Sequence, residues 1–367
     1  MRHLLHVFPS FRVGGSQARF AVLANAFGAK YRHSIVALDG AFDCASRLGC
    51  DVPRILCAPD VGRFGLPSRL AALRARLRAS SPALLLTYNW GAIEWALANR
   101  LRPICPHVHF EDGFGRDEAD RQFKRRIVLR RIALSGDSRI VVPSHTLLDV
   151  ARRIWRLADH RLLYIPNGVD CRRFGATRDP QLRERLTPDQ SALLIGTVAA
   201  LRPEKNIARL IRCAAPLFGR FDLRLVIVGD GVERAALGSL AAALGIGDRV
   251  IFAGAQPRPE EFLPHFDIFA ISSDTEQMPL TVLEAMAAGL PVAGLDVGDV
   301  KQMVAPSAQR FIAPRSADSG LTDALATLLA DPALRDEVGE ANRRHVRAHY
   351  SLDAMLAAYD RLFSESG

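Results

Sequence analysis

Short apolar runs alternate with helical stretches along the whole chain, and this alternation limits the possible folds more than any other feature. The runs lie at 4–8, 34–38, 83–87 and 140–142 in the first half and at 193–198, 223–228, 250–253, 268–271 and 291–294 in the second. Strands that alternate with helices predict parallel sheets with helices on both faces. Two such sets predict an α/β protein with two Rossmann-like domains.

The alternation breaks at mid-chain, in a segment that contains Gly175, Pro188 and several charged residues. With 367 residues, the chain is long enough for two domains of ordinary size. We therefore expect a first domain over 1–172, a linker over 173–190 and a second domain over 191–350. The segment 351–367 is predicted to be helical, because apolar residues recur there at helical spacing.

Two carboxylates, Glu276 and Glu284, flank a predicted turn from a strand into a helix. Pro279 suits a first helical position and Gly289 suits a helix stop, so Glu276 is expected on the loop and Glu284 inside the helix. A helix start attracts phosphate, whereas carboxylates accept hydrogen bonds from sugar hydroxyls. The combination fits a nucleotide sugar; the alternative is an ordinary solvated helix with an exposed glutamate.

Two cations three residues apart, Arg202 and Lys205, follow the buried run at 193–198. Arg offers a bidentate fork and Lys a point charge, and together they can neutralise a leaving diphosphate. Isolated basic residues on a loop are otherwise ordinary surface charges. Ligands of open α/β sheets bind beyond the carboxyl ends of the strands. The candidate residues follow predicted strands, so the two domains are expected to face each other across one cleft: Gly14, Gly15, His109, Arg202, Gly229 and Glu276.

Several common site motifs are missing from the sequence. It has no G-x-G-x-x-G with a downstream acid, which argues against a nicotinamide enzyme, and no phosphate-binding loop of the Walker type. It also has no D-x-D pair to hold a metal at a diphosphate. We expect no metal and no cofactor, with Arg202, Lys205 and the helix start taking the electrostatic role of a metal.

The six cysteines include no C-x-x-C pair. The apolar run at the start of the chain is too short and too interrupted for a signal peptide or a membrane span. We expect a cytoplasmic protein with reduced thiols. A nucleic-acid partner is not expected, because no recognition motif is present and the basic region lacks interleaved aromatic residues of the stacking kind.

Basic residues are concentrated in the first half of the chain. Residues 1–170 hold 26 Lys and Arg against 14 Asp and Glu, and residues 171–367 hold 22 against 25. The excess peaks between Arg121 and Ile132, where cations alternate with apolar residues in a predicted helix. Such a helix can lie on an anionic membrane at its inner face or receive an acidic acceptor. The alternative is a surface helix with one face in the core.

Five motifs in order resemble the retaining glycosyltransferases of family 4, which have the GT-B fold. They are Gly14-Gly15 after the first apolar run, Ile165-Pro-Asn-Gly-Val-Asp170 before the linker, Gly196 with Arg202 and Lys205, the Val228-Gly-Asp-Gly231 turn, and the pair Glu276 and Glu284. The resemblance covers nearly the full length. It implies an acceptor-binding first domain, a second domain that binds a nucleoside-diphosphate sugar, and a last helix that crosses back onto the first domain.

Carried over residue by residue, the resemblance implies that Arg202 and Lys205 hold the donor diphosphate and that Glu284 binds the ribose. Glu276 would contact the transferred sugar, and His109 would face the sugar and acceptor. Taken as groups, the catalytic candidates are His109, Arg202, Lys205 and Glu276. The donor-binding candidates are Gly15, Gly196, Arg202, Lys205, Gly229, Gln277, Met278, Pro279, Leu280 and Glu284. The acceptor-binding candidates are Gly14, His109, Glu111 and Asp112.

The sequence departs from the family in the loop that would face the sugar. Many members follow the first glutamate with glycines, whereas this chain has Gln277, Met278 and Pro279, and proline has no N–H to donate. The hypothesis is a glycosyltransferase that moves a hexose-type sugar to an acceptor hydroxyl, with retention, in cell-envelope glycan or polysaccharide synthesis. A GT-B nucleotide-sugar epimerase and a non-catalytic membrane-surface or scaffolding protein of the same fold are the alternatives.

Overall fold

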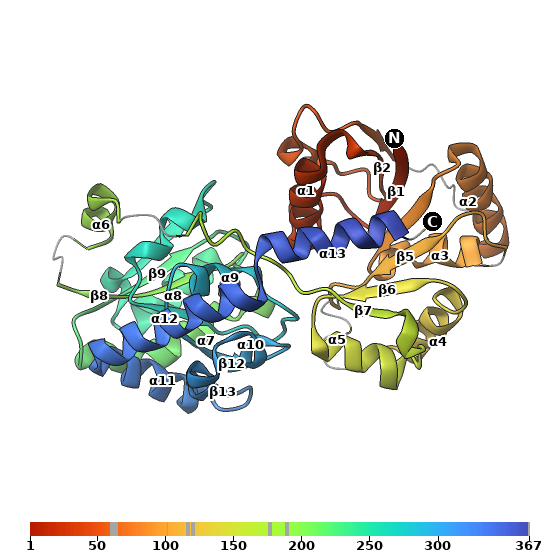
Figure 1. Ribbon diagram of the computed structural model, residues 1–367. Coiled ribbons are helices and arrows are strands. Elements are labelled where there is room, and N and C mark those ends of the chain that lie inside the picture. Colours follow the sequence, from red (N-terminus) through yellow and green to blue (C-terminus); the bar gives the residue numbers. More distant parts are fainter. Residues whose placement is uncertain are drawn as a thin grey trace. The chain divides into compact units, whose positions relative to one another are not determined.

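The chain forms two compact units in the computed structural model, which describes residues 1–58, 65–100, 102–114, 118, 122–174, 178–187 and 191–365. One unit comprises Met1–Asn167 with Met355–Gly367, and the other comprises Gly168–Ala354 (Figure 1). The division thus falls five residues before the predicted end of the first domain. Within the predicted linker, 175–177 and 188–190 lie outside the described residues, as do the last two residues of the chain.

The first unit contains a seven-stranded parallel sheet with the order β3-β2-β1-β4-β5-β6-β7. Its strands are β1 (Arg2–Phe8), β2 (Tyr31–Ala37), β3 (Arg54–Cys57), β4 (Leu84–Tyr88), β5 (His107–Phe110), β6 (Arg139–Val142) and β7 (Leu162–Tyr164). Its main helices are α1 (Gly15–Phe27), α2 (Leu66–Ser80), α3 (Ile93–Arg100), α4 (Lys124–Ala133) and α5 (His145–Asp149), and α5 continues into η5 (Val150–Ile154). The inner strands are almost wholly buried, which fits a sheet covered on both faces.

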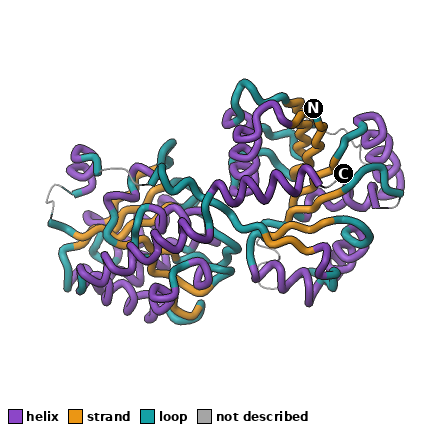
Figure 2. Tube along the Cα trace, in the orientation of Figure 1, coloured by secondary structure: helices purple, strands orange, loops and turns teal. Residues whose placement is uncertain are grey.

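The second unit contains a six-stranded parallel sheet with the order β10-β9-β8-β11-β12-β13. Its strands are β8 (Leu193–Val198), β9 (Leu223–Val228), β10 (Val250–Gly254), β11 (Ile268–Ile271), β12 (Val292–Asp296) and β13 (Ile312–Pro314). Its helices are α6 (Pro180–Leu186), α7 (Ile207–Ala214), α8 (Arg234–Ala243), α9 (Leu280–Ala287), α10 (Val300–Met303), α11 (Asp318–Ala330) and α12 (Pro332–His349). Figure 2 shows helices packed around the strands of both units. The prediction of two Rossmann-like domains is therefore confirmed.

The last helix, α13 (Leu352–Glu365), begins in the second unit and packs on the first. Phe363 is 1% exposed, and its ring contacts those of Phe27 and Tyr31. Asp360 accepts hydrogen bonds from Lys30 and from the Tyr31 hydroxyl. The buried side of α13 thus completes the core beside α1 and β2. In the described part of the chain, no helix is both long and apolar enough to span a bilayer.

Candidate functional site

Two loops meet at the carboxyl edge of the second sheet because the strands before them, β8 and β11, are neighbours. The first loop contains the short turn η7 (Pro203–Lys205), and the second runs from Ser272 to Pro279. The Asp274 N–H donates to the Glu204 carbonyl at 2.9 Å, and the Ser272 hydroxyl donates to the carbonyls of Lys205 and Asn206. These hydrogen bonds fix the two predicted donor-binding loops against each other.

Lys205 and Glu276, predicted separately from the sequence, are in direct contact. The Lys205 Nζ lies 2.6 Å from Glu276 Oε1, and the Ser273 hydroxyl donates to the same oxygen at 2.7 Å. The Lys205 side chain is 28% exposed and that of Glu276 is 10% exposed, so the pair lies at the edge of the protein surface. Arg202 precedes η7 and is exposed. Three charged groups therefore line one strand-end surface, and two of them, Lys205 and Glu276, are paired with each other.

Asn206 holds the first loop in place through an unusual backbone conformation. Its φ of 43° is left-handed, and its side chain caps α7 by accepting a hydrogen bond from the Arg209 N–H. Its amide also donates to Asp274, which pairs with Arg209 at 2.7 Å. The sequence reasoning did not identify Asp274 or Arg209. Both are charged residues next to predicted elements, Arg209 at the start of α7 and Asp274 on the loop after β11. Only the order of the strands in the sheet shows that the two side chains meet.

The predicted glycines of the second unit have steric reasons for their identity. A Cβ at Gly196 would lie 2.0 Å from the ring of Phe266, and Gly196 stands within β8 rather than after it. A Cβ at Gly229 would lie 1.9 Å from the Ala199 carbonyl oxygen, and its φ is 139°. Gly229 therefore lets the loop after β9 lie directly against the loop after β8. Gly196 makes room for an aromatic ring in the core. This packing alone explains the glycine, so no role in binding a donor sugar is needed to explain it.

The helix α9 begins one residue later than predicted. Pro279 is its N-cap, with extended backbone, and Leu280 is the first helical residue. Met278 is 5% exposed and packs in the core. The Gln277 carbonyl accepts from the Asp299 N–H at 2.9 Å. A Cβ at Gly298 would lie 2.4 Å from the Glu276 carbonyl oxygen. The loop itself has no glycine at 277–279, but it packs against the glycine at position 298.

Glu284 lies partly buried on α9, next to two other charged side chains. Its pKa is raised to about 7, chiefly by burial and also by the nearby Glu260 carboxylate, whereas Arg173 opposes the shift. Arg173 also pairs with Glu260 at 2.5 Å. The sequence reasoning named Glu284 but missed Glu260, whose approach depends on the loop after β10. Glu284 can accept hydrogen bonds as a carboxylate or donate one as an acid near neutral pH.

In the first unit, Gly14 and Gly15, which were expected in a loop after the first strand, lie at the start of α1. Gly14 is the N-cap, and a Cβ there would meet the side-chain oxygen of Gln17 at 2.8 Å. A Cβ at Gly15 would meet no atom within 4 Å. The first turn of α1 therefore has open space beside Gly15, with N–H groups that lack helical partners.

His109 was expected after a strand, facing a ligand, but it lies within β5 and is fully buried. Its Nδ1 is 2.8 Å from the Thr87 hydroxyl, and its Nε2 is 3.6 Å from Glu111 Oε2. Glu111, expected to bind acceptor, also has no exposed surface. The expectation that His109 follows a strand is thus wrong, because the alternating polar and apolar residues His107-Val-His-Phe110 form the strand β5 itself.

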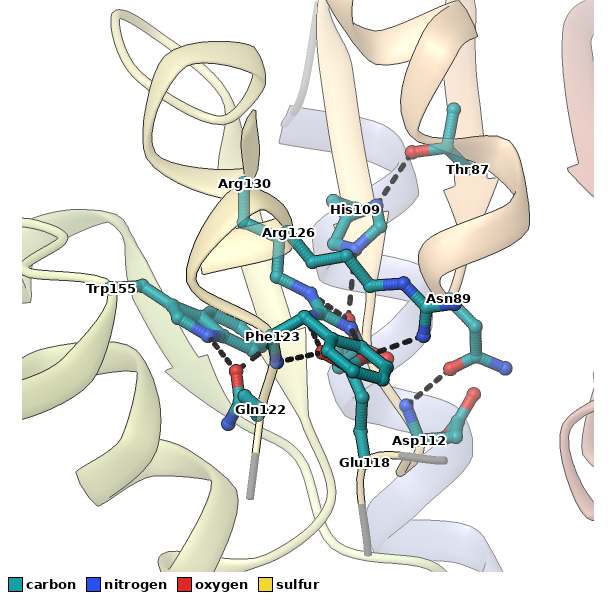
Figure 3. Close-up of polar contacts among 11 residues, drawn as sticks. Thr87, Asn89, His109, Asp112, Glu118, Gln122, Phe123, Arg126, Arg130 and Trp155 are labelled. Carbon is teal, nitrogen blue, oxygen red and sulfur yellow. Dashed lines mark hydrogen bonds and ion pairs between the residues drawn. The ribbon is translucent and has the colours of Figure 1, made fainter. Parts of the chain in front are cut away.

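A buried arginine, Arg130 on α4 (Figure 3), accounts for the burial of Glu111. It is 1% exposed, and it pairs with Glu111 at 3.3 Å and with Glu118 at 3.2 Å. Its guanidinium also lies over three aromatic rings at 5.0–5.4 Å, those of Trp90, Phe114 and Trp155. One residue of the basic stretch therefore lies in the core and forms ion pairs there. The spacing of basic and apolar residues in the sequence did not predict this burial.

Arg126 on the same helix adds a second inward contact, an ion pair with Glu118 at 3.0 Å. Burial raises the pKa of Glu118, but the hydrogen bonds from Arg126 and Arg130 outweigh it, so the pKa lies below its usual range. Arg121, the first residue of the predicted basic helix, lies outside the described residues. The outer face of α4 carries Lys124, Arg125 and the apolar residues described below.

Asp112 lies in the loop after β5 and pairs with Arg19, a residue that the sequence reasoning missed. The Arg19 Nη1 lies 2.6 Å from Asp112 Oδ1 and donates to Asn167 Oδ1 at 2.9 Å. Burial would lower the pKa of Arg19, but the Asp112 carboxylate raises it above its ordinary value. The Asp112 N–H is held by Asn89, whose φ is 55°. Arg19 therefore ties α1 and the loop after β5 to the end of the first unit.

Two parallel sheets in separate units, each with helices on its faces, define a two-domain α/β protein of the GT-B class. The model of the glycosyl transferases group 1 matches residues 179–345, and that of the glycosyl transferase 4-like domain matches residues 14–168. This chain belongs to the family of group 1 glycosyl transferases with the GT-B fold.

Individual relatives agree with this placement. A GDP-mannose-dependent alpha-(1-6)-phosphatidylinositol monomannoside mannosyltransferase of Mycobacterium tuberculosis is 30% identical over 310 residues, which cover 80% of this chain and 73% of the relative. An N-acetyl-alpha-D-glucosaminyl L-malate synthase of Bacillus anthracis is 24% identical over 235 residues, covering 64% of this chain but only 61% of the relative. The solved structure of Anabaena Alr3699/HepE in complex with UDP superposes with a TM-score of 0.83 at 18% identity, over the full length of both chains.

Proposed function

We propose that this chain is a retaining glycosyltransferase that moves a hexose-type sugar from a nucleoside-diphosphate sugar to an acceptor hydroxyl. The contact between Lys205 and Glu276 supports the proposal, because an ammonium group that can bind a diphosphate lies next to a carboxylate that can accept hydrogen bonds from sugar hydroxyls, after two neighbouring strands of the second sheet. The relatives agree in donor type: one is named as GDP-mannose-dependent, and HepE was solved with UDP. The proposed setting is cell-envelope glycan or polysaccharide synthesis.

In the proposed reaction, the bond between the sugar and the diphosphate breaks while the acceptor oxygen bonds to the anomeric carbon. Arg202 and Lys205 neutralise the charge that develops on the leaving diphosphate, and a leaving phosphate oxygen accepts the acceptor proton. Lys205 exchanges part of its contact with Glu276 for the diphosphate, which frees Glu276 to accept a hydrogen bond from the sugar. Glu284 binds the ribose. The proposed reaction needs no metal, because the two cations and the start of α9 supply the positive charge.

The donor site is tested by thermal unfolding with UDP and with GDP. A ligand at 100 times its dissociation constant adds about 2.7 kcal/mol of stability, so one of the two should raise the melting temperature of the native protein. The double variant Arg202→Ala, Lys205→Ala should lose this rise and reduce turnover by on the order of 100-fold. Arg212→Ala, an exposed change on α7, is the matched control. Equal stabilisation of the double variant and the native protein would remove these residues from the donor site.

We also propose that the outer face of α4 contacts an anionic membrane surface. Phe123, Val128 and Ile132 are 42%, 51% and 51% exposed, and Lys124 and Arg125 are exposed beside them. Apolar side chains can enter the headgroup region while the cations stay at the anionic lipids. This face would bring the protein to a lipid-linked acceptor.

Sedimentation with vesicles tests the membrane contact. Vesicles rich in phosphatidylserine should bind the native protein at low salt and release it at high salt. The variant Val128→Ser, Ile132→Ser should bind several-fold more weakly, whereas Val232→Ser, which removes an even more exposed apolar group from the second unit, should bind normally. Equal binding of both variants would show that the α4 face is not the contact.

A further inference from the structure

A large cavity lies at the edge of the second sheet opposite to the proposed donor loops. Its volume is about 650 Å³, within the range of small-molecule sites. Phe266 and Asp267 line it directly before β11, and Leu290 and Pro291 line it directly before β12. Because all strands of this sheet are parallel, these amino ends lie at the edge away from Lys205 and Glu276. A ligand in this cavity therefore cannot be the one held by the donor loops.

Four arginines converge on the cavity: Arg178, Arg335, Arg343 and Arg347. Three of them come from one side of α12. Two carboxylates, Asp267 and Asp336, also line the cavity, and Asp267 already accepts a hydrogen bond from the Leu194 N–H at 2.7 Å. The lining thus keeps an excess of positive charge, and its floor includes apolar side chains such as Phe266.

Most of the guanidinium donors around the cavity are not used by acids of the protein. Within the described part of the chain, Arg335 donates only to the carbonyls of Leu328 and Leu329, and Arg178 only to that of Pro264. Among the described residues, no carboxylate lies within ion-pair distance of Arg178, Arg335 or Arg347. Arg343 pairs with Glu340, but its buried Nε has no hydrogen-bond partner within the described part of the chain.

We infer that this cavity binds a small molecule with two or more phosphate groups, at a site separate from the donor loops. Each arginine fork can bind two phosphate oxygens at once. A ligand with two or more phosphate groups can therefore bind several guanidinium groups that have no carboxylate partner. The apolar floor gives room for the uncharged part of the molecule. The inference does not depend on the proposed transferase activity, because it uses other residues at another edge of the sheet.

Calorimetric titration with inorganic tripolyphosphate tests the site on the full chain. We expect binding to the native protein and at least a tenfold loss of affinity in Arg335→Gln, Arg347→Gln. The single change Arg347→Gln, at an exposed residue, should lose part of the affinity without affecting the carbonyl contacts of Arg335. Arg344→Gln is the matched control, because Arg344 lies on α12, is 68% exposed and does not line the cavity.

The double variant Arg202→Ala, Lys205→Ala separates the two sites. If tripolyphosphate also enters the donor loops, this variant should lose one binding event and keep the one that depends on Arg335 and Arg347. The inference is overturned if the native protein does not bind tripolyphosphate. It is equally overturned if binding disappears in the donor-loop variant and is unchanged in Arg335→Gln, Arg347→Gln.

Discussion

At the scale of single residues, the proposed donor site depends on charges that are already engaged. Lys205 is held by Glu276, and Glu284 shares its surroundings with Glu260 and Arg173. A diphosphate must therefore compete with a carboxylate for the Lys205 ammonium, whereas Arg202 is exposed and ready to bind. This difference predicts that Arg202 makes the first contact with a donor and that Lys205 follows as Glu276 turns to the sugar.

The raised pKa of Glu284 leads to a stability prediction with a definite sign. Folded Glu284 keeps its proton up to about pH 7, whereas the unfolded chain loses it near the ordinary glutamate value. Between these values the folded state binds more protons, so the carboxyl group costs stability as the pH rises. Glu284→Gln should therefore stabilise the protein increasingly, by about 2 kcal/mol more at pH 8 than at pH 5.5.

Urea unfolding at several pH values measures this effect. Glu337→Gln, at an exposed position on α12, is the control and should show no such trend. A Glu284→Gln difference that stays constant from pH 5.5 to 8 would mean that Glu284 is solvated like an ordinary glutamate.

At the scale of elements, the first sheet carries an unusual number of buried histidines. His6 and His33 contact each other at 3.0 Å, and His107 lies 2.8 Å from the hydroxyls of both Thr87 and Ser138. Burial lowers the pKa of His33 to about 4 and that of His107 to about 3, with neighbouring histidines adding to each shift. These rings stay neutral in the folded state at pH values where they are charged in the unfolded chain.

The histidines predict acid sensitivity well above the range in which carboxylates titrate. Below about pH 6.5 the unfolded chain binds more protons than the folded one, so stability falls as the pH falls. For His33 and His107 together, the loss between pH 7.5 and 5 should be about 4 kcal/mol. Urea unfolding measures it, and NMR should show at least two histidines, His33 and His107, that do not titrate in this range. A stability that is flat from pH 7.5 to 5 would contradict the prediction.

The longer apolar strands were predictable from the sequence, and most of the strands with three or four residues were not. The predicted ranges 193–198, 223–228 and 268–271 match β8, β9 and β11, because long apolar runs are buried on both faces. Three of the missed strands, β3, β7 and β13, are sheet edges with three or four residues, and Ile55 in β3 is 53% exposed. The fourth, β5, is an inner and buried strand, but it has only four residues and two of them are histidines. A short edge strand gains little from burial, so its sequence carries little pattern.

The candidate site shows the same division. Arg202, Lys205 and Glu276 were predictable because strand ends of a parallel sheet meet at one edge, and local sequence marks those ends. The partners Asp274, Glu260 and Arg19 were not, because their approach depends on sheet order and loop paths. The burial of Arg130 was also not predicted. A basic residue on an amphipathic helix does not indicate that a carboxylate 12 to 19 residues away is buried beside it.

At the scale of the whole molecule, the first unit is built from two distant parts of the chain. Residues 355–365 of α13 supply Tyr359 and Phe363 to a core otherwise formed by residues before 168. Phe363→Ala removes a ring that is 1% exposed, and we expect a loss of about 3–5 kcal/mol in the free energy of unfolding. Arg361→Ala, exposed on the same helix, should cost less than about 0.5 kcal/mol in urea unfolding. Similar losses for the two variants would show that the buried face of α13 does not stabilise the first unit.

The position of α13 at the end of the chain also delays completion of the first unit during synthesis. Translation must pass through the whole second unit, residues 168–354, before the helix that packs on β2 and α1 exists. At bacterial or eukaryotic elongation rates of about 5–20 residues per second, this interval lasts roughly 10–40 seconds. During that time the rings of Phe27 and Tyr31 lack the Phe363 ring that covers them in the finished protein. The first half of this protein to leave the ribosome is thus the last to be completed, and its unfinished apolar surface is where a chaperone would bind.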